Sequence, residues 1–168
     1  KRQIFILLTA SLIPAPTIAQ ESGTTEEAPP AAPIIELWNL TETPAYAWFL
    51  NDEYILLGYT NDTTAAEVTY NERLGIVTYS VPVEIRRSGT GEVVWNDTPP
   101  DGVVRVAKVV DDGAALETIL DLNITELFGS GYVCRYHWPL PQGVLVAAVK
   151  VANVLRIYDY NGSLLYET

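Results

Sequence analysis

The stretch VPVEIRRSGTGEVVW, residues 81–95, decides the fold class of this sequence. Val81, Val83 and Ile85 alternate with other residues, as in a strand that places one face on a hydrophobic core. The segment SGTG that follows is rich in turn residues, and it leads into a second apolar run that ends at Trp95. The stretch therefore predicts an antiparallel β-hairpin.

Short apolar or alternating runs separated by turn signals recur about every ten residues on both sides of this hairpin. This spacing is typical of antiparallel sandwiches and barrels. We expect an all-β protein, an immunoglobulin-like or jelly-roll-type antiparallel β-sandwich with an extended N-terminal segment. The expected strands, some of which should merge or form loops, cover residues 34–38, 46–50, 54–60, 66–70, 76–79, 81–87, 92–96, 103–110, 116–122, 132–138, 144–158 and 163–166.

A second hairpin is expected at the C-terminus. Apolar runs at residues 154–158 and 164–166 flank the dipeptide Asn161-Gly162. This dipeptide suits the positive φ angles of a type I′ turn. The pattern predicts two strands joined by such a turn.

Residues 114–126 are the one segment that could compete as a helix. Its β-branched content makes a strand at least as favourable. In a regular strand the alternate residues Leu116, Thr118, Leu120 and Leu122 would share one face.

The first twenty residues have the layout of a secretory signal peptide. Lys1 and Arg2 precede an apolar run at residues 4–13, and small residues suit a cleavage site near Ala19 or Gln20. The apolar run, about ten residues long, is shorter than the roughly twenty that a membrane-spanning helix needs. The alternative is that residues 1–20 are retained and act as a donor strand in the sheet of a neighbouring subunit.

The domain organisation follows from composition. Residues 1–20 form the apolar segment, and residues 21–33 form a linker rich in Pro and Glu without large apolar side chains. Residues 34–168 form the expected β-sandwich domain. We expect no membrane span in the mature chain.

Asn-x-Ser/Thr sequons occur at five of the eight asparagines. Asn and Thr both favour turns, which inflates such a count, but the sequons coincide with an independent export signal. We therefore expect an exported glycoprotein from an archaeal or eukaryotic lineage. The expected acceptors are Asn39, Asn61, Asn96, Asn123 and Asn161.

Charge excludes some partners. The chain has 10 Lys and Arg against 21 Asp and Glu, a formal net charge of -11. A phosphate backbone or an anionic membrane repels such a chain unless a basic patch exists, and only Arg86-Arg87 resembles one. We expect no nucleic-acid partner.

Nucleophilic chemistry would have to use the single cysteine, Cys134, and the single histidine, His137. These residues lie three apart on an expected strand, where they should point to opposite faces. Packing of both side chains is therefore favoured over a catalytic dyad. One cysteine excludes an intrachain disulfide, and the pair offers too few ligands for zinc.

Loop carboxylates offer hard oxygen atoms to calcium at Asp111-Asp112-Gly113 and at Asn96-Asp97 with Asp101. Neither group has the spacing of an EF-hand, so solvated turns are the favoured interpretation. We expect no catalytic, cofactor-binding or metal-binding residue, and no enzymatic activity.

Aromatic residues could form a face that binds a carbohydrate or a protein, because flat amphipathic rings stack on such ligands. Core packing is favoured for most of them. The four tryptophans are Trp38, Trp48, Trp95 and Trp138, and the tyrosines expected to be exposed are Tyr158, Tyr160 and Tyr166.

Several short motifs carry a family resemblance. They are YTNDT at residues 59–63, VPVEI at 81–85, GEVVW at 91–95 and YHWPLPQGV at 136–144. Over roughly residues 54–150 the chain resembles immunoglobulin-like domains of the BsuPI proteinase-inhibitor type. The resemblance implies an immunoglobulin-like fold and no reactive-site residue, and residues 103–126 depart from the pattern.

Together these features predict a non-enzymatic secreted or cell-surface glycoprotein. We expect a structural or adhesive subunit of a filament, pilus-like fibre or surface layer, which self-associates with identical subunits through strand edges. The alternative is a soluble extracellular module that binds a protein or glycan ligand, such as a protease inhibitor or a carbohydrate binder.

Overall fold

The computed structural model describes residue 40, residues 42–60 and residues 67–168. Of these residues, 57% lie in strands and 7% in helices, and all strand pairs are antiparallel. The expected all-β, sandwich-like fold is confirmed. The expected strand at residues 34–38 and the proposed domain start lie outside the described residues.

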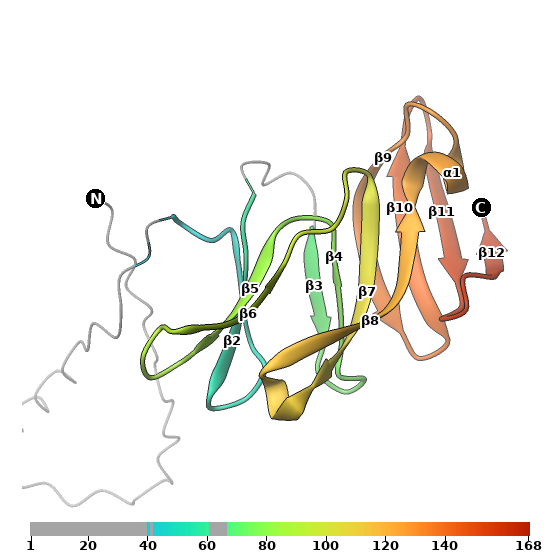
Figure 1. Ribbon diagram of the computed structural model, residues 1–168. Helices are drawn as coiled ribbons and strands as arrows, with labels where there is room; N and C mark the ends of the chain where they lie inside the picture. The colour runs from blue at the N-terminus through green and yellow to red at the C-terminus, as the bar shows by residue number, and fades with distance from the viewer. Residues whose placement is uncertain (1–39, 41, 61–66) are drawn as a thin grey trace, which may run out of the picture.

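The strands form three four-stranded sheets (Figure 1). The first sheet has the order β1 (Tyr46–Phe49), β2 (Tyr54–Gly58), β5 (Val83–Arg87) and β6 (Val93–Asp97). The middle sheet has the order β3 (Val68–Asn71), β4 (Ile76–Tyr79), β7 (Val103–Val110) and β8 (Ala115–Asn123). The C-terminal sheet is a meander of β9 (Val133–Leu140), β10 (Gly143–Val149), β11 (Asn153–Tyr158) and β12 (Leu164–Glu167). A 3-10 turn (Asp111–Gly113) joins β7 to β8, and helix α1 (Ile124–Phe128) follows β8.

Successive hairpins of the first two sheets alternate between them. The hairpins β1–β2 and β5–β6 belong to the first sheet, and the hairpins β3–β4 and β7–β8 belong to the middle sheet. Each hairpin therefore packs face to face against the next one along the chain. Within the described part of the chain, no helix is long and apolar enough to cross a membrane.

The first core lies between the first and middle sheets. Leu56 of β2 and Ile85 of β5 meet Val77 and Tyr79 of β4, and all four side chains are fully buried. These residues alternate with others along their strands, as the period of two in a strand requires.

The second core lies between the middle and C-terminal sheets. Val104 and Val106 of β7 pack with Val144 and Val146 of β10, and the residues of α1 close one end of this core. Ile76 of β4 also belongs to it, although its neighbour Val77 belongs to the first core. The middle sheet is therefore buried on both faces.

A β-bulge lets β8 serve both cores. The register with β7 shifts between Val106 and Ala107, and Ile119 is the extra residue of the bulge. Leu116 packs in the first core and Leu122 in the second. The expected strand is confirmed, but the expectation that these alternate residues share one face is wrong because the bulge reverses the alternation.

Both predicted hairpins are confirmed, as β5–β6 and β11–β12. The turn of the second hairpin differs from the expectation, because Gly162 has a φ of 84° while Asn161 has no positive φ. The Gly162 N–H donates to the Asp159 carbonyl, and Asp159 Oδ1 accepts from the N–H groups of Asn161 and Ser163. The Asp159 side chain therefore stabilises a longer loop than the two-residue type I′ turn.

The β9–β10 connection depends on a glycine. A Cβ atom on Gly143 would lie 1.9 Å from the Tyr158 carbonyl oxygen and 2.8 Å from Asp159 Cα. Gly143→Ala should therefore push β10 away from β11 and lower the free energy of unfolding by about 3 kcal/mol or more in urea denaturation. Gly89→Ala is the control, because its Cβ would contact nothing within 4 Å. Equal losses in the two variants would contradict the prediction.

Candidate functional site

A buried polar cluster surrounds the single histidine where β9 crosses β3 and β4. His137 is 1% exposed, and its Nδ1 atom lies 2.7 Å from Thr78 Oγ1. The Thr69 hydroxyl lies 2.6 Å from the Thr78 hydroxyl. It donates a hydrogen bond to the His137 carbonyl oxygen at 3.0 Å. Ser80 Oγ lies 3.4 Å from Nε2. The cluster joins the middle sheet to the C-terminal sheet by hydrogen bonds.

Burial lowers the pKa of His137 to about 3, so the imidazole is neutral across the physiological range. A general base works best when its pKa lies near the working pH. An imidazole with this pKa cannot take the proton of the Ser80 hydroxyl efficiently. Nδ1 faces a threonine hydroxyl rather than a carboxylate that would orient it as in a catalytic triad.

Cys134 and His137 lie on the same face of β9, in contrast to the expectation from the sequence. Arg135 is the extra residue of a β-bulge, so Cys134 pairs with Ala148 and His137 pairs with Val146. Both partners point into the second core. The expected opposite orientation is wrong because the bulge adds one residue to the alternation.

The two shared-face residues have the wrong protonation states for a nucleophilic dyad. Burial, with a contribution from the Glu67 carboxylate, raises the pKa of the Cys134 thiol to about 11. Burial lowers the pKa of His137. A reactive cysteine needs a lowered thiol pKa and a cationic partner. Both shifts instead favour the neutral thiol and the neutral imidazole, as in packed core residues.

The histidine makes a testable contribution to the pH dependence of stability. The unfolded chain binds a proton at His137 below a pKa of about 6.5, and the folded chain does so only near pH 3. Stability from this group is complete above the unfolded pKa and decreases as the pH falls. From pH 7 to pH 5 we expect the wild type to lose about 2 kcal/mol more than His137→Gln does, measured by urea denaturation. Parallel losses in the two proteins would show that His137 is protonated when folded.

The acidic residues considered for calcium have other partners. Asp97 Oδ2 accepts from Arg105 Nη1 at 2.7 Å and from the Tyr79 hydroxyl at 2.8 Å. Partial burial acts to raise the Asp97 pKa, but these hydrogen bonds hold it below its usual value. Arg105 also forms a bidentate pair with Asp121. Among residues 40, 42–60 and 67–168, no three His, Cys, Asp or Glu side chains are grouped to hold a metal ion.

Three of the predicted sequons lie in the described residues. Asn96 and Asn161 are exposed. Asn123 is half-buried and caps α1, because its Oδ1 accepts from the N–H groups of Thr125 and Glu126. The glycan-bearing atom would be Nδ2, which donates to Glu126 Oε1 at 3.2 Å, whereas the cap uses Oδ1. Asn39 and Asn61 lie outside the described residues.

The expected exposure of the C-terminal tyrosines is wrong for one of the three. Tyr158 is buried in the second core because its pairing partner on β10, Val144, faces that core. Tyr160 is half-buried and donates to the Leu140 carbonyl, whereas Tyr166 is exposed. Trp48 and Trp95 pack against the first core, as expected, and Trp38 lies outside the described residues.

The C-terminal sheet has a second apolar face, called here the outer face, which points away from the middle sheet. The strand registers place mainly apolar residues on it, with Asn153 as the polar exception, and the exposed Arg135 of the β9 bulge lies beside Tyr136 at its rim. The rings of Tyr136 and Trp138 lie parallel there, 6.3 Å apart. The apolar side chains on this face are Val133, Tyr136, Trp138, Leu140, Leu145, Ala147, Val149, Leu155, Ile157 and Tyr166.

The same sheet ends in an exposed edge strand. β12 pairs with β11 on one side, and no described strand pairs with its other side. Leu164, Leu165 and Tyr166 are 51%, 52% and 56% exposed. Glu167, the one charged residue of β12, forms an ion pair with Arg156 of β11. The outer face and this edge are the unpartnered apolar surfaces of the C-terminal sheet among the described residues.

The fold and these surfaces define an all-β protein of three stacked antiparallel sheets. No family model matches the chain, and no curated protein matches it. Among solved structures it is similar to the quinohemoprotein alcohol dehydrogenase from Comamonas testosteroni, with 14% identity and a TM-score of 0.41. The likeness covers 75% of this chain and 22% of the dehydrogenase chain. A likeness at this level carries no argument about activity.

Proposed function

We propose that this protein is a non-enzymatic, exported structural subunit that assembles with identical copies through the edge strand β12. The observation that carries the proposal is the exposure of all four residues of β12, three of them large and apolar. Unpaired backbone groups on an exposed edge are a template for a further strand. Monomeric proteins protect such edges with lysine, proline, inward-pointing charges or β-bulges. β12 has a single bulge, at Leu165, and no lysine or proline. On β12 the single charge is already engaged with Arg156.

Either of two segments of a second copy could pair with the β12 edge. A two-fold arrangement pairs β12 with β12 and closes a dimer with a continuous sheet. A donor strand from the apolar segment at residues 34–38 of another copy, or from residues 1–20 in the alternative that they are retained, would instead add subunits in a row. Both arrangements use main-chain hydrogen bonds for affinity and place Leu165 at the new contact.

Export and glycosylation are part of the proposal. The signal-like segment and the sequons support them together. Asn161 lies in the β11–β12 loop and Asn96 on β6, and both are exposed. A glycan on Asn161 would sit at the end of β12 and would leave its lateral edge accessible.

Export can be measured by intact mass and N-terminal sequencing of protein from its native source. We expect the mature chain to begin near Gln20 and to carry excess mass that an amidase for N-linked glycans removes. The expected sites include Asn96 and Asn161. A chain that begins at Lys1 without excess mass would contradict export and glycosylation, and would favour the retained donor strand.

Edge assembly can be tested with Leu165→Lys. Lysine on an edge strand opposes pairing because the new strand would have to bury or displace its charge. We expect the variant to have a lower weight-average mass in light scattering than the wild type. Its free energy of unfolding should change by about 0.5 kcal/mol or less. Val151→Lys, at a 95% exposed position in the β10–β11 turn, adds the same charge and should leave the mass unchanged. If both variants have the same mass as the wild type, β12 is not the assembly contact.

A second candidate function is a binding module for glycans or proteins. The parallel rings of Tyr136 and Trp138 favour it, because such rings stack on sugars. Sugar sites also use placed polar groups, and the outer face offers only Asn153, Arg135 at its rim, two tyrosine hydroxyls and one indole N–H. This scarcity of polar groups ranks the binding module second.

A further inference from the structure

We infer that the outer face of the C-terminal sheet is a second self-association surface, on which the outer face of another copy docks face to face. The inference rests on the proposed function, since it concerns assembly of identical copies. It assigns a different surface, however, because docking of faces needs side chains and edge pairing needs backbone groups.

The outer face has the composition of a covered sheet face. In an antiparallel sheet with one solvated side, apolar and polar residues alternate along each strand. In β10 the inward residues Val144, Val146 and Ala148 alternate with the outward residues Leu145 and Ala147, so both sides are apolar. Such strands normally have a packing partner on each side.

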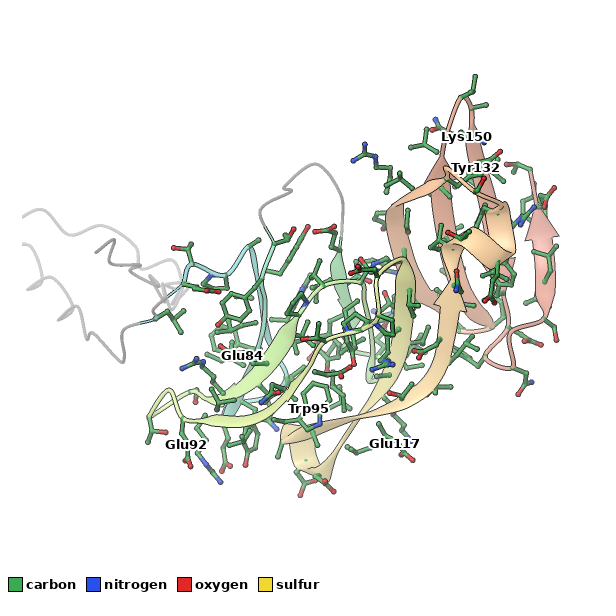
Figure 2. The ribbon with its side chains drawn as sticks, turned by 45° about the horizontal axis from the view of Figure 1, so that its top comes forward. Glu84, Glu92, Trp95, Glu117, Tyr132 and Lys150 are labelled. Carbon is green, nitrogen blue, oxygen red and sulfur yellow. The ribbon has the colours of Figure 1, made fainter. Side chains whose placement is uncertain are left out.

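The opposite end of the stack differs, because the outer side of the first sheet carries charged side chains. On the outer side of the first sheet, Glu84 and Arg86 of β5 lie beside Leu57 and Ile55 of β2. Glu84 accepts from Arg86 Nε at 2.6 Å and from the Tyr59 hydroxyl (Figure 2 labels Glu84). Leu57 and Ile55 are buried. On the outer face of the C-terminal sheet no carboxylate is present among the described residues, and the one charged side chain is Arg135 at the rim, on β9.

Charge favours a second copy as the occupant at this face in particular. The chain has a formal net charge of -11, so two copies repel over most approaches. Two outer faces can meet without bringing carboxylates together, because neither carries any. A two-fold axis places the same patch of both subunits in contact, and an apolar patch without carboxylates is complementary to itself.

Face-to-face packing of sheets, the proposed docking mode, already occurs within the chain. The inner face of this sheet packs on the middle sheet through Val144, Val146 and Ala148. Sheets that pack in this way lie about 10 Å apart and interdigitate apolar side chains. A second outer face would cover Trp138 and Leu155 by the same kind of contact.

The area predicts a weak dimer. Four strands of about six residues cover a footprint of about 400 Å² per copy, at strand spacing of about 4.8 Å and a rise of about 3.4 Å. The flat footprint of two copies is therefore about 800 Å², and the uneven surface of the side chains adds to the buried area. The total approaches the roughly 1,000 Å² that a biological interface needs. The dimer should therefore dissociate on dilution.

Sedimentation velocity of the full chain over a wide range of concentration tests the inference. Leu165→Lys blocks the edge, and in this background we expect a reversible monomer–dimer equilibrium. Adding Leu155→Glu should weaken the dimer by at least about 30-fold, because it buries an unpaired charge at the centre of the contact. Phe49→Glu, at a half-exposed position on the first sheet, is the matched control and should leave the dimer unchanged.

Folding of each variant is checked by circular dichroism. If Leu155→Glu does not fold, Tyr166→Glu replaces it, because Tyr166 lies on the same face and is more than half exposed. A folded face variant that still dimerises like the control overturns the inference.

The outcomes separate the two proposals. If the wild type assembles and Leu165→Lys is monomeric, the outer-face inference is overturned and the edge proposal is supported. Assembly that survives Leu165→Lys but is lost in Leu155→Glu supports the face and removes the edge. A wild type that is monomeric at every concentration overturns both. A monomer whose tryptophan fluorescence responds to an oligosaccharide panel assigns the face to sugars and overturns docking of a second copy.

Discussion

Burial of the middle sheet on both faces is the constraint on which the rest of this structure depends. Ile76 and Val77 of β4 are neighbours in sequence, yet they pack in different cores. A sheet with two apolar faces is stable only when a layer covers each of them, since apolar burial supplies most of the favourable free energy of folding. The first sheet covers one face and the C-terminal meander covers the other. Polar contacts then fix how the layers sit: Tyr79 and Arg105 hold Asp97 of the first sheet, and Thr78 holds His137 of the C-terminal sheet.

The sequence predicts what is local in this fold. The β5–β6 and β11–β12 hairpins follow from alternation and turn residues close together in the chain. Bulges such as those at Ile119 and Arg135 could not be predicted, because the position of a bulge depends on which core each flanking segment meets, and that depends on distant strands. One added residue reverses every side chain beyond it. This is why the faces of β8 and the relative orientation of Cys134 and His137 were predicted wrongly.

The apolar outer face could have been predicted from the sequence of β10. The prediction missed it because it treated residues 144–158 as one strand, whereas they form β10 and β11. The stretch VLVAAV of β10 is apolar at every position, which is typical of a strand covered on both sides. The edge of β12 left a weaker signal. Its exposure follows from its place as the last strand of the meander, which the spacing of apolar runs does not specify. The buried cluster around Thr69, Thr78 and His137 left none, because its members are far apart in sequence.

The two unpartnered surfaces of the C-terminal sheet extend a structure in perpendicular directions. Pairing at β12 adds strands along the hydrogen-bonding direction, about 4.8 Å at a time, whereas docking on the outer face adds a layer about 10 Å away along the stack. The two contacts use different atoms, so one subunit can make both at once. In the proposed assembly, two-fold docking uses the outer face of both copies, so growth by this contact closes after two copies and a longer array would have to propagate through the edges.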